Sequence, residues 1–249
     1  MSYLEFHLVF LLPPIAGMAF TIPHTLDDFG GWAAPWAVPL ISSIALLYTT
    51  PWDNYLVARE VWWYGPNRVL GTIGYVPFEE YLFFILQPVL TGLFLLHYLG
   101  RWDGDRRRSG PMCAWIGSLG FLLITIAGAG LLAGGRDGSL YLGLVLAWTS
   151  PVLAGMWLYD GETLWAHRTT LLPTVGLPTL YLWIADATAI SQEIWTISPT
   201  FTIGVSPFGL PLEEATFFLM TNLLVVKGIL LLLYGSHETL GETITDVRD

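Results

Sequence analysis

Long apolar stretches separated by short polar segments dominate the chain. Each stretch has about 18 residues or more, enough for a helix to cross roughly 30 Å of hydrocarbon. The seven stretches lie near residues 4–22, 33–50, 79–99, 112–133, 140–158, 169–187 and 211–234. The pattern predicts an all-α polytopic membrane protein with seven transmembrane helices. Internal prolines predict kinks or irregular turns in the second and sixth stretches: Pro35, Pro39, Pro173 and Pro178.

The composition agrees with this class. Only 12% of the 249 residues are charged and 54% are hydrophobic, whereas soluble globular domains carry about 25% charged residues. No basic segment precedes the first apolar run, so we expect residues 4–22 to be a retained helix and not a cleaved signal. Cys113 is the only cysteine, which excludes an intrachain disulfide.

Basic residues in the short loops predict the orientation of a multi-pass cell-membrane protein. The rule is that loops rich in Lys and Arg stay in the cytoplasm. The loops after the first, third and fifth stretches, together with the C-terminal tail, carry Arg101, Arg106, Arg107, Arg108, Arg168 and Arg248. The opposite loops carry Arg59, Arg68 and Arg136. This imbalance places the N-terminus outside the cell. The net charge of −10 gives no reason to expect a nucleic-acid partner.

A motif occurs twice in the chain, and all its residues recur at one constant offset. Its first copy is Pro77, Glu79, Glu80, Phe83 and Phe84, and its second copy is Pro211, Glu213, Glu214, Phe217 and Phe218. Tyr48, Asp53 and Trp62 also recur, as Tyr181, Asp186 and Trp195, with a spacing one residue shorter than that between the two motif copies. A fainter match pairs residues 13–18 with 151–156. We predict two parallel three-helix repeats joined by an extra helix, with boundaries at 1–110, 111–136 and 137–249.

The repeated acids suggest acid–base chemistry. Glu79 and Phe83 are spaced i, i+4, as are Glu80 and Phe84, so a helix stacks each acid over an aromatic ring. Two adjacent carboxyls at an apolar mouth cannot easily both ionise, so one keeps a proton and can act as a general acid. Aromatic faces would stabilise a carbocation. The pattern favours proton-initiated rearrangement of an alkene. The alternative is that these glutamates only cap helix N-termini.

Two aspartates and several tryptophans extend the candidate site. Asp53 and Asp186 close the second and sixth apolar stretches, and we expect Asp53 to be a third acid that Asn54 orients. An Asx turn after a helix is the alternative role for Asp53. Trp62 and Trp195 belong either to an interfacial aromatic belt or, as their repetition favours, to a pocket wall.

Other searches predict no cofactor and no metal. Gly128, Gly130 and Gly134 resemble a dinucleotide loop, but they lie in or beside an apolar stretch without a preceding strand. We expect these glycines to permit close helix packing instead. The five histidines lack the spacing of metal ligands.

The string Pro-Trp-Asp-Asn at 51–54 and the motifs at 77–84 and 211–218 together resemble the membrane-embedded lycopene cyclases of archaea, actinobacteria and fungi. The resemblance covers about residues 1–235, with both halves fused in one chain. It implies an intramolecular lyase or isomerase, lycopene β-cyclase, which converts the acyclic ends of lycopene into β-ionone rings. The products would be γ-carotene and then β-carotene, without net redox change and without flavin. It also implies lycopene and other hydrophobic carotenoids, the lipid bilayer and other carotenoid-pathway enzymes as partners.

The resemblance assigns residues to the site by position. The catalytic acids would be Glu79, Glu80, Glu213, Glu214, Asp53 and Asp186. The substrate would contact Trp52, Asn54, Trp62, Phe83, Phe84, Trp195, Phe217 and Phe218. One site that processes both ends in turn is favoured over two sites. The sequence leaves open which carboxyl gives the proton and which receives it.

Three alternatives remain at the level of sequence. A related membrane enzyme, such as a hydratase of the carotenoid end group, would use the same first protonation and let water trap the cation. A carotenoid carrier would need the aromatic residues but not the acids. A retinal protein would use Lys227, the only lysine, as a Schiff base.

Overall fold

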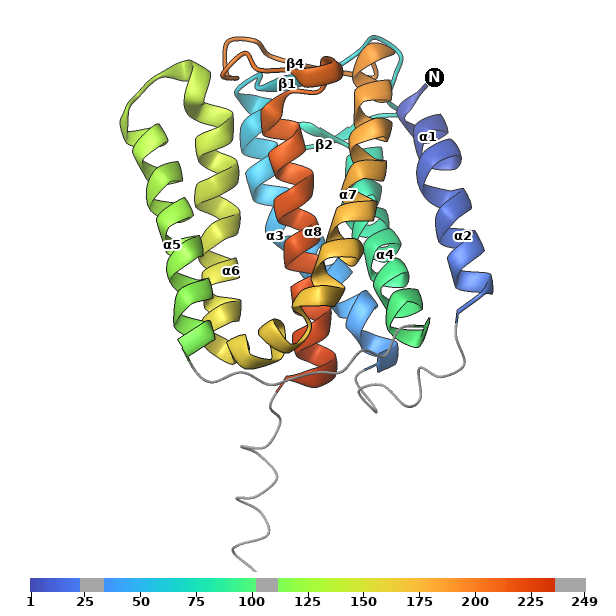
Figure 1. Ribbon diagram of the computed structural model, residues 1–249. Helices are drawn as coiled ribbons and strands as arrows, with labels where there is room; N and C mark the ends of the chain where they lie inside the picture. Colours follow the sequence, from blue (N-terminus) through green and yellow to red (C-terminus); the bar gives the residue numbers. More distant parts are fainter. Residues whose placement is uncertain (23–33, 102–111, 236–249) are drawn as a thin grey trace, which may run out of the picture.

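The structure, a computed structural model, describes residues 1–22, 34–101 and 112–235. Long helices stand side by side in one bundle (Figure 1). The first comprises α1 (Tyr3–Phe6), a π-helical turn (His7–Leu11) and α2 (Leu12–Phe20). The others are α3 (Ala34–Ala58), α4 (Phe78–Arg101), α5 (Met112–Ala133), α6 (Leu140–Ala166), α7 (Arg168–Ser191) and α8 (Leu212–Tyr234). The predicted all-α fold is confirmed in the described part of the chain.

Five helical segments in the described part are long and apolar enough to cross a membrane: Tyr3–Phe20, Phe78–Arg101, Met112–Ala133, Asp137–Ala166 and Leu212–Tyr234. Helices α3 and α7 also form where the second and sixth spans were predicted, and they run through their internal prolines. They fall short of this apolar standard because each carries prolines, hydroxyl side chains and an aspartate along its length.

The predicted ends of α3 and α7 are wrong. Asp53 was expected to follow a helix, yet α3 continues to Ala58, and α7 likewise runs past Asp186 to Ser191. The Asx-turn alternative for Asp53 is thereby excluded. A proline removes one helical hydrogen bond, but packing of the next turns outweighs that loss. Leu56, which lies beyond Pro51, is fully buried.

Both helices end in the same cap. Glu60 and Glu193 have positive φ angles of 57° and 54°. The following N–H groups of Val61 and Ile194 donate back to the carbonyls of Leu56 and Ala189, at 3.0 and 3.1 Å. This is the Schellman arrangement, which satisfies free carbonyls and reverses the chain. Each cap delivers the chain into a short strand that covers one end of the bundle.

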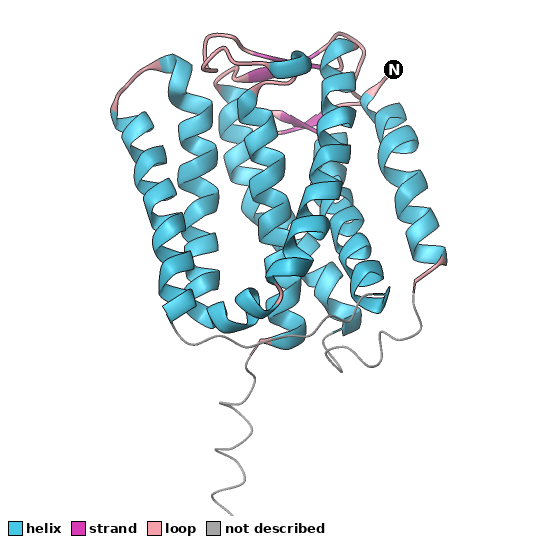
Figure 2. Cartoon of the chain, viewed as in Figure 1, coloured by secondary structure: helices cyan, strands magenta, loops and turns pink. Residues whose placement is uncertain are grey.

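Short strands form a roof over that end (Figure 2). β1 (Trp62–Tyr64) pairs with β4 (Trp195–Ile197) antiparallel, with Trp63 opposite Thr196. β2 (Thr72–Ile73) pairs with β3 (Val76–Pro77). The 3₁₀ turns Asp137–Ser139 and Pro207–Gly209 precede α6 and α8. The roof therefore lies above the start of α4 and of α8, where the glutamate motifs are.

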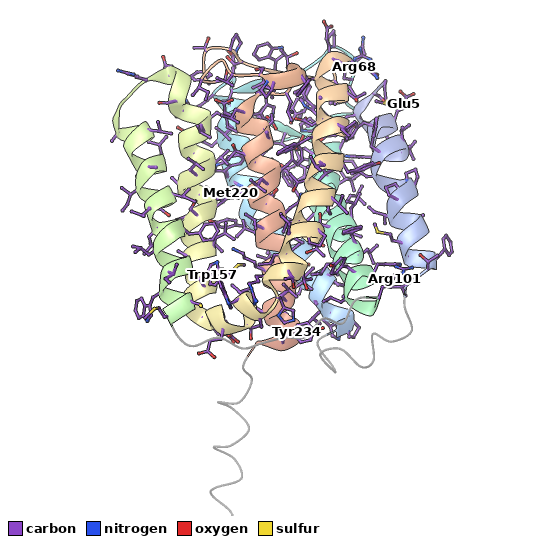
Figure 3. All side chains as sticks on the ribbon, viewed as in Figure 1. Glu5, Arg68, Arg101, Trp157, Met220 and Tyr234 are labelled. Atoms are coloured by element: carbon purple, nitrogen blue, oxygen red, sulfur yellow. The ribbon has the colours of Figure 1, made fainter. Side chains whose placement is uncertain are left out.

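Arg68 fastens the N-terminus to this roof. Its guanidinium donates to the carbonyls of Met1 and Gln192, at 3.0 and 2.9 Å. The backbone N–H of Tyr3 donates to the Arg68 carbonyl at 2.8 Å. Figure 3 shows Arg68 and Glu5 at this end of the bundle, and Arg101 and Tyr234 toward the other end. The contacts fix the position of Tyr3, the first residue of the bundle.

Helix α5 packs beside α6 at one edge of the bundle (Figure 1). A Cβ atom at Gly128 would lie 2.7 Å from the Ala147 backbone nitrogen, so glycine permits close packing there, as predicted. Gly130 has no atom within 4 Å of that position and does not share this role. Residues 106–108 and Arg248, on which the predicted orientation depends, lie outside the described residues.

Candidate active site

A cavity of about 430 Å³ lies under the roof. Four carboxyl side chains from four different helices line it: Asp53 of α3, Glu80 of α4, Asp186 of α7 and Glu214 of α8. Both aspartates are 2% exposed. The carboxyls are near enough to interact electrostatically with one another. No Lys or Arg is among the described residues that line the cavity, so no basic side chain there would neutralise negative charge on these carboxyls.

The two glutamates of each motif face different ways. Glu79 and Glu213 are fully buried, but neither lines the cavity. The Oε1 atom of Glu79 accepts a hydrogen bond from the Leu70 backbone N–H at 2.8 Å, and that of Glu213 accepts one from the Ile203 N–H at 2.7 Å. These two residues therefore hold the loops that precede α4 and α8, while their neighbours Glu80 and Glu214 reach the cavity.

Three tyrosines donate hydrogen bonds to the cavity glutamates. Tyr3 and Tyr64 both donate to Oε2 of Glu80, at 2.8 and 3.0 Å. Tyr141 donates to Oε1 of Glu214 at 2.8 Å. Burial, followed by the charges of Glu80 and Asp53, raises the pKa of the Tyr64 phenol well above its ordinary value. Tyr64 therefore keeps its proton at neutral pH and remains a donor.

The two aspartates differ in their hydrogen bonds. The indole N–H of Trp195 donates to Oδ1 of Asp186 at 2.9 Å. Trp62 occupies the matching position near Asp53, but its indole N–H donates to the Tyr64 hydroxyl at 3.2 Å. The Oδ2 atoms of both aspartates are buried without a partner in the described part of the chain. Asp186 is thus oriented by a donor that Asp53 does not receive.

Aromatic rings surround the carboxyls. Trp52 stacks on Phe217 with ring centroids 5.7 Å apart and lies 6.2 Å from Trp62. Phe83 meets Phe218 edge to face at 6.1 Å. All five rings line the cavity. A cation formed in it would face several electron-rich ring surfaces.

Comparisons with known proteins identify the family. Two proteins of Halobacterium salinarum, from strains R1 and NRC-1, are both called lycopene beta-cyclase and are each 39% identical to the chain over 234 residues. The alignment covers 92% of this chain and 95% of theirs. The chain belongs to the lycopene beta-cyclase family. A bifunctional lycopene cyclase/phytoene synthase of Blakeslea trispora is 32% identical over 91% of the chain and 38% of the fungal protein. No family model and no solved structure matches the chain.

Most of the residues that the resemblance to lycopene cyclases nominated converge on one cavity. Besides the four carboxyls, its wall includes Trp52, Trp62, Phe83, Trp195, Phe217 and Phe218. Phe84 lies instead in an adjoining apolar groove. Asn54 does not orient Asp53: its Oδ1 accepts from the Tyr75 backbone N–H at 3.0 Å, and its amide donates to the Tyr81 hydroxyl at 3.1 Å. This expectation was wrong because the β2–β3 turn lies close enough to engage the Asn54 side chain.

Sequence reasoning missed the three tyrosines of this lycopene cyclase-family site. Tyr3 and Tyr141 are separated by the same offset as the faint match between 13–18 and 151–156. Extending that match toward the N-terminus would have nominated both. Tyr64 has no such signal, because Ile197 stands at its matching position.

Lys227, which the retinal-protein alternative requires, lies elsewhere in the bundle. Its ammonium group lies 4.2 Å from the centroid of the Phe121 ring and 5.2 Å from that of Trp157. Lys227 is not among the residues that line the acid cavity. Contact with two aromatic faces accounts for how a cation is tolerated at this buried position.

Proposed function

We propose that this protein cyclises the two acyclic ends of lycopene to β-ionone rings, yielding γ-carotene and then β-carotene. The observation that carries the proposal is the convergence of four carboxyl groups and six tryptophan and phenylalanine rings on one buried cavity. Family membership supplies the substrate, because the archaeal relatives are named lycopene beta-cyclases. The cavity supplies the acid, the base and the aromatic surfaces that such a reaction needs.

The reaction balances without a cofactor. A carboxylic acid adds a proton to the terminal double bond, which leaves a tertiary carbocation. A second double bond of the same chain attacks that cation, so one carbon–carbon bond closes the ring and the positive charge moves onto it. A ring carbon then loses a proton to a carboxylate, and a ring double bond forms. The product is an isomer of the substrate.

Asp53 is the proton donor in this proposal. A hydrogen-bond donor stabilises the charged form of a carboxylate. Glu80 receives two such bonds, and Asp186 and Glu214 receive one each. Asp53 has its buried Oδ2 free and is flanked by negative groups. It is therefore the carboxyl that the cavity suits best as a neutral acid.

Asp186 is the proton acceptor. Trp195 holds one of its oxygens and stabilises its charge, while the other oxygen, Oδ2, is free of partners in the described part of the chain. That arrangement leaves an oriented basic oxygen facing the cavity. Glu80 and Glu214, held by phenols, supply negative charge that stabilises the carbocation. Trp52 and Phe217 offer their stacked rings to the same cation.

Glu79 and Glu213 have a structural role in this scheme. Each contacts a backbone amide of the loop before its helix instead of the cavity. They keep Glu80 and Glu214 at fixed positions because adjacent residues on one helix move together. The motif contains two acids because one anchors the loop and the other faces the substrate.

The chain is built from two parallel repeats, 1–110 and 137–249, which 111–136 joins. Strands β1 and β4 occupy matching positions, since Trp62 and Trp195 begin them, and their pairing is self-complementary about Trp63 and Thr196. A two-fold axis through that pair produces such a register. Carboxyls from both repeats line one cavity, which supports a single site that serves the two substrate ends in turn.

Expression in a lycopene-accumulating bacterial host tests the proposal. The wild-type chain should convert lycopene to γ-carotene and β-carotene, and Glu80→Gln and Glu214→Gln should each prevent this. Glu60→Gln, which alters an exposed acid in the α3 cap, is the matched control and should behave as wild type. Unchanged lycopene despite verified membrane expression of the wild type would contradict the function. Products that have gained water would identify a hydratase instead.

A further inference from the structure

A long apolar furrow leads away from the acid cavity. Its upper part, about 870 Å³ between α3, α4, α6 and α8, shares Phe83 and Phe217 with the cavity. Its lower part, about 960 Å³ between α3, α6 and α8, shares Ile41 and Val152 with the upper part. From Phe217 to Leu232 at the lower end, α8 rises by about 23 Å at ~1.5 Å per residue. We call this continuous groove the α3–α6 furrow.

The furrow is open at the side of the bundle. Ile44 and Tyr48, two of its α3 residues, are 50% and 39% exposed. Its lower end also includes Tyr159, which is 67% exposed. Tyr159 lies on α6, which is long and apolar enough to cross a membrane, and α3 stands beside it in the bundle, so we expect the opening to face hydrocarbon. A molecule dissolved in the bilayer can enter such a groove sideways without crossing water.

The matching region on the other side of the bundle, the filled side, is partly filled by larger side chains. There, between α2, α4 and α7, Leu182 stands where the furrow has Thr49, and Phe94 stands where it has Gly228. Leu182 is 1% exposed and packs in the main core cluster. The His97 ring also closes α4 onto the end of α2, with its Nε2 atom 3.0 Å from the Thr21 carbonyl oxygen.

The apolar cavity that remains on this filled side is separate from the acid cavity. It measures about 480 Å³, against about 870 Å³ for the upper furrow alone. None of its lining residues lines the acid cavity. The two sides therefore share a pattern of helices, but within the described residues these apolar cavities reach the acids from one side only.

We propose that the α3–α6 furrow holds the polyene chain of the substrate, and that both ends of one carotenoid reach the acids through it, one after the other. The inference rests on the proposed cyclase function. Only the reacting end group has to reach the acids, so the rest of a rod-shaped hydrocarbon must lie in continuous apolar space, and the furrow adjoins the acid cavity at Phe83 and Phe217. The monocyclic product must then leave, reverse its direction and re-enter with its open end leading.

This route makes the two ring closures unequal. During the first closure, the trailing end in the furrow is a slender open chain. During the second, the trailing end carries a ring, which is wider. A side chain that narrows the lower furrow should therefore hinder the second closure more than the first, and the monocyclic product should accumulate.

Two glycines at matching positions provide the test. Gly155 lines the lower furrow, and Gly17, on the filled side, is its counterpart in the faint match between 13–18 and 151–156. A Cβ atom at either position would meet no atom within 4 Å, so a side chain can begin at both positions without a clash at its first atom. Gly155→Phe should lower β-carotene formation about tenfold or more, the order of effect of a misfit in an apolar pocket. Its monocyclic fraction should rise, and Gly17→Phe should match wild type.

A second variant and a binding measurement complete the experiment. Thr49→Leu copies the filled side into the upper furrow and should reduce formation of both rings. In an inactive Glu214→Gln background, Gly155→Phe should also reduce the lycopene that co-purifies with the protein, measured by absorbance. Wild-type product ratios in both Gly155→Phe and Thr49→Leu would overturn the furrow assignment, as would an equal loss in Gly17→Phe. Absence of cyclic products from the wild type would instead refute the cyclase function.

Discussion

The two aspartates of the acid cavity occupy matching positions but have different surroundings. Asp186 receives a hydrogen bond from Trp195. The matching tryptophan, Trp62, donates instead to the Tyr64 hydroxyl. Tyr64 in turn donates a hydrogen bond to Glu80. Ile197 stands where a second tyrosine would restore the symmetry. This one difference gives the two carboxyls different surroundings, which in the proposed mechanism suit Asp53 as the acid and Asp186 as the base. The comparison teaches that a single different residue at matching positions can give two like carboxyls different hydrogen-bond partners.

The largest difference is expected between Asp53→Asn and Asp186→Asn. Removing the proton donor should lower the cyclisation rate about 10³-fold, within the range for general acids. Asp186→Asn should cost less, about tenfold to a hundredfold, because a carbocation releases its proton readily and other carboxylates are near. Carotene formation by membranes supplied with lycopene measures both rates. Equal losses, or a larger loss in Asp186→Asn, would reverse the assignment.

Tyr64→Phe should remove the hydroxyl group that makes the hydrogen bonds around Asp53 differ from those around Asp186. Glu80 would lose one of two phenol donors, and the Trp62 indole would be free to turn to Asp53 and stabilise its charged form. A hydrogen bond to a charged group is worth about 1.5–3 kcal/mol, so the rate should fall about tenfold to a hundredfold.

A second substitution sharpens this test. In the Tyr64→Phe background, Trp62→Phe removes the diverted donor and should restore part of the activity. The activity of the double variant is compared with that of each single variant. If Trp62→Phe lowers the cyclisation rate by the same factor in the Tyr64→Phe background as in the wild type, Trp62 does not act through Asp53.

The two remaining phenols should have unequal effects. Tyr141→Phe removes the one phenol that donates to Glu214 and should lower the rate about tenfold, since a charged group loses its donor. Tyr3→Phe leaves Glu80 with Tyr64 and should lower it only about threefold. Side-by-side rate measurements at matched expression decide this. A larger loss of rate in Tyr3→Phe than in Tyr141→Phe would contradict the proposal that these phenols stabilise negative charge on Glu80 and Glu214.

The smallest effects, and equal ones, are expected at the loop anchors. Glu79→Gln and Glu213→Gln each keep an acceptor oxygen for the loop N–H. Each should destabilise the protein by about 1 kcal/mol and leave the rate within about twofold of wild type. Thermal denaturation in detergent and the carotene assay measure the two quantities. A loss of activity as severe as that of Glu80→Gln would place these residues in the chemistry.

The sequence predicted the bundle and much of the site for separate reasons. Apolar runs long enough to span a bilayer predict helices because no other element satisfies backbone groups there. The constant offsets between the two copies of the motif predicted that acids from both halves are related, and four of the six nominated acids do line one cavity. Periodicity could not tell which acid of each adjacent pair faces the substrate, because the loops before α4 and α8 decide it.

What the sequence could not predict depends on tertiary contacts. The end of the apolar stretch at residue 50 suggested that α3 stopped near Asp53, yet burial of Leu56 extends the helix. Asn54 looked like a partner for Asp53 because the two are adjacent, but the β2–β3 turn engages it through the Tyr75 N–H. Tyr64 was one aromatic residue among many near the membrane boundary. Its importance emerges only when its contacts with Trp62 and Glu80 are known.

The most direct test of one shared site compares single inactivating changes from the two halves. Asp53→Asn and Glu214→Gln would be expressed separately in a lycopene-accumulating host, and the acyclic, monocyclic and bicyclic carotenes of each would be measured. One shared cavity predicts that either change alone suppresses both the first and the second ring. If the chain had two independent sites, each variant would keep one active site. Steady production of cyclic carotenes near half the wild-type rate in either variant would therefore contradict the account.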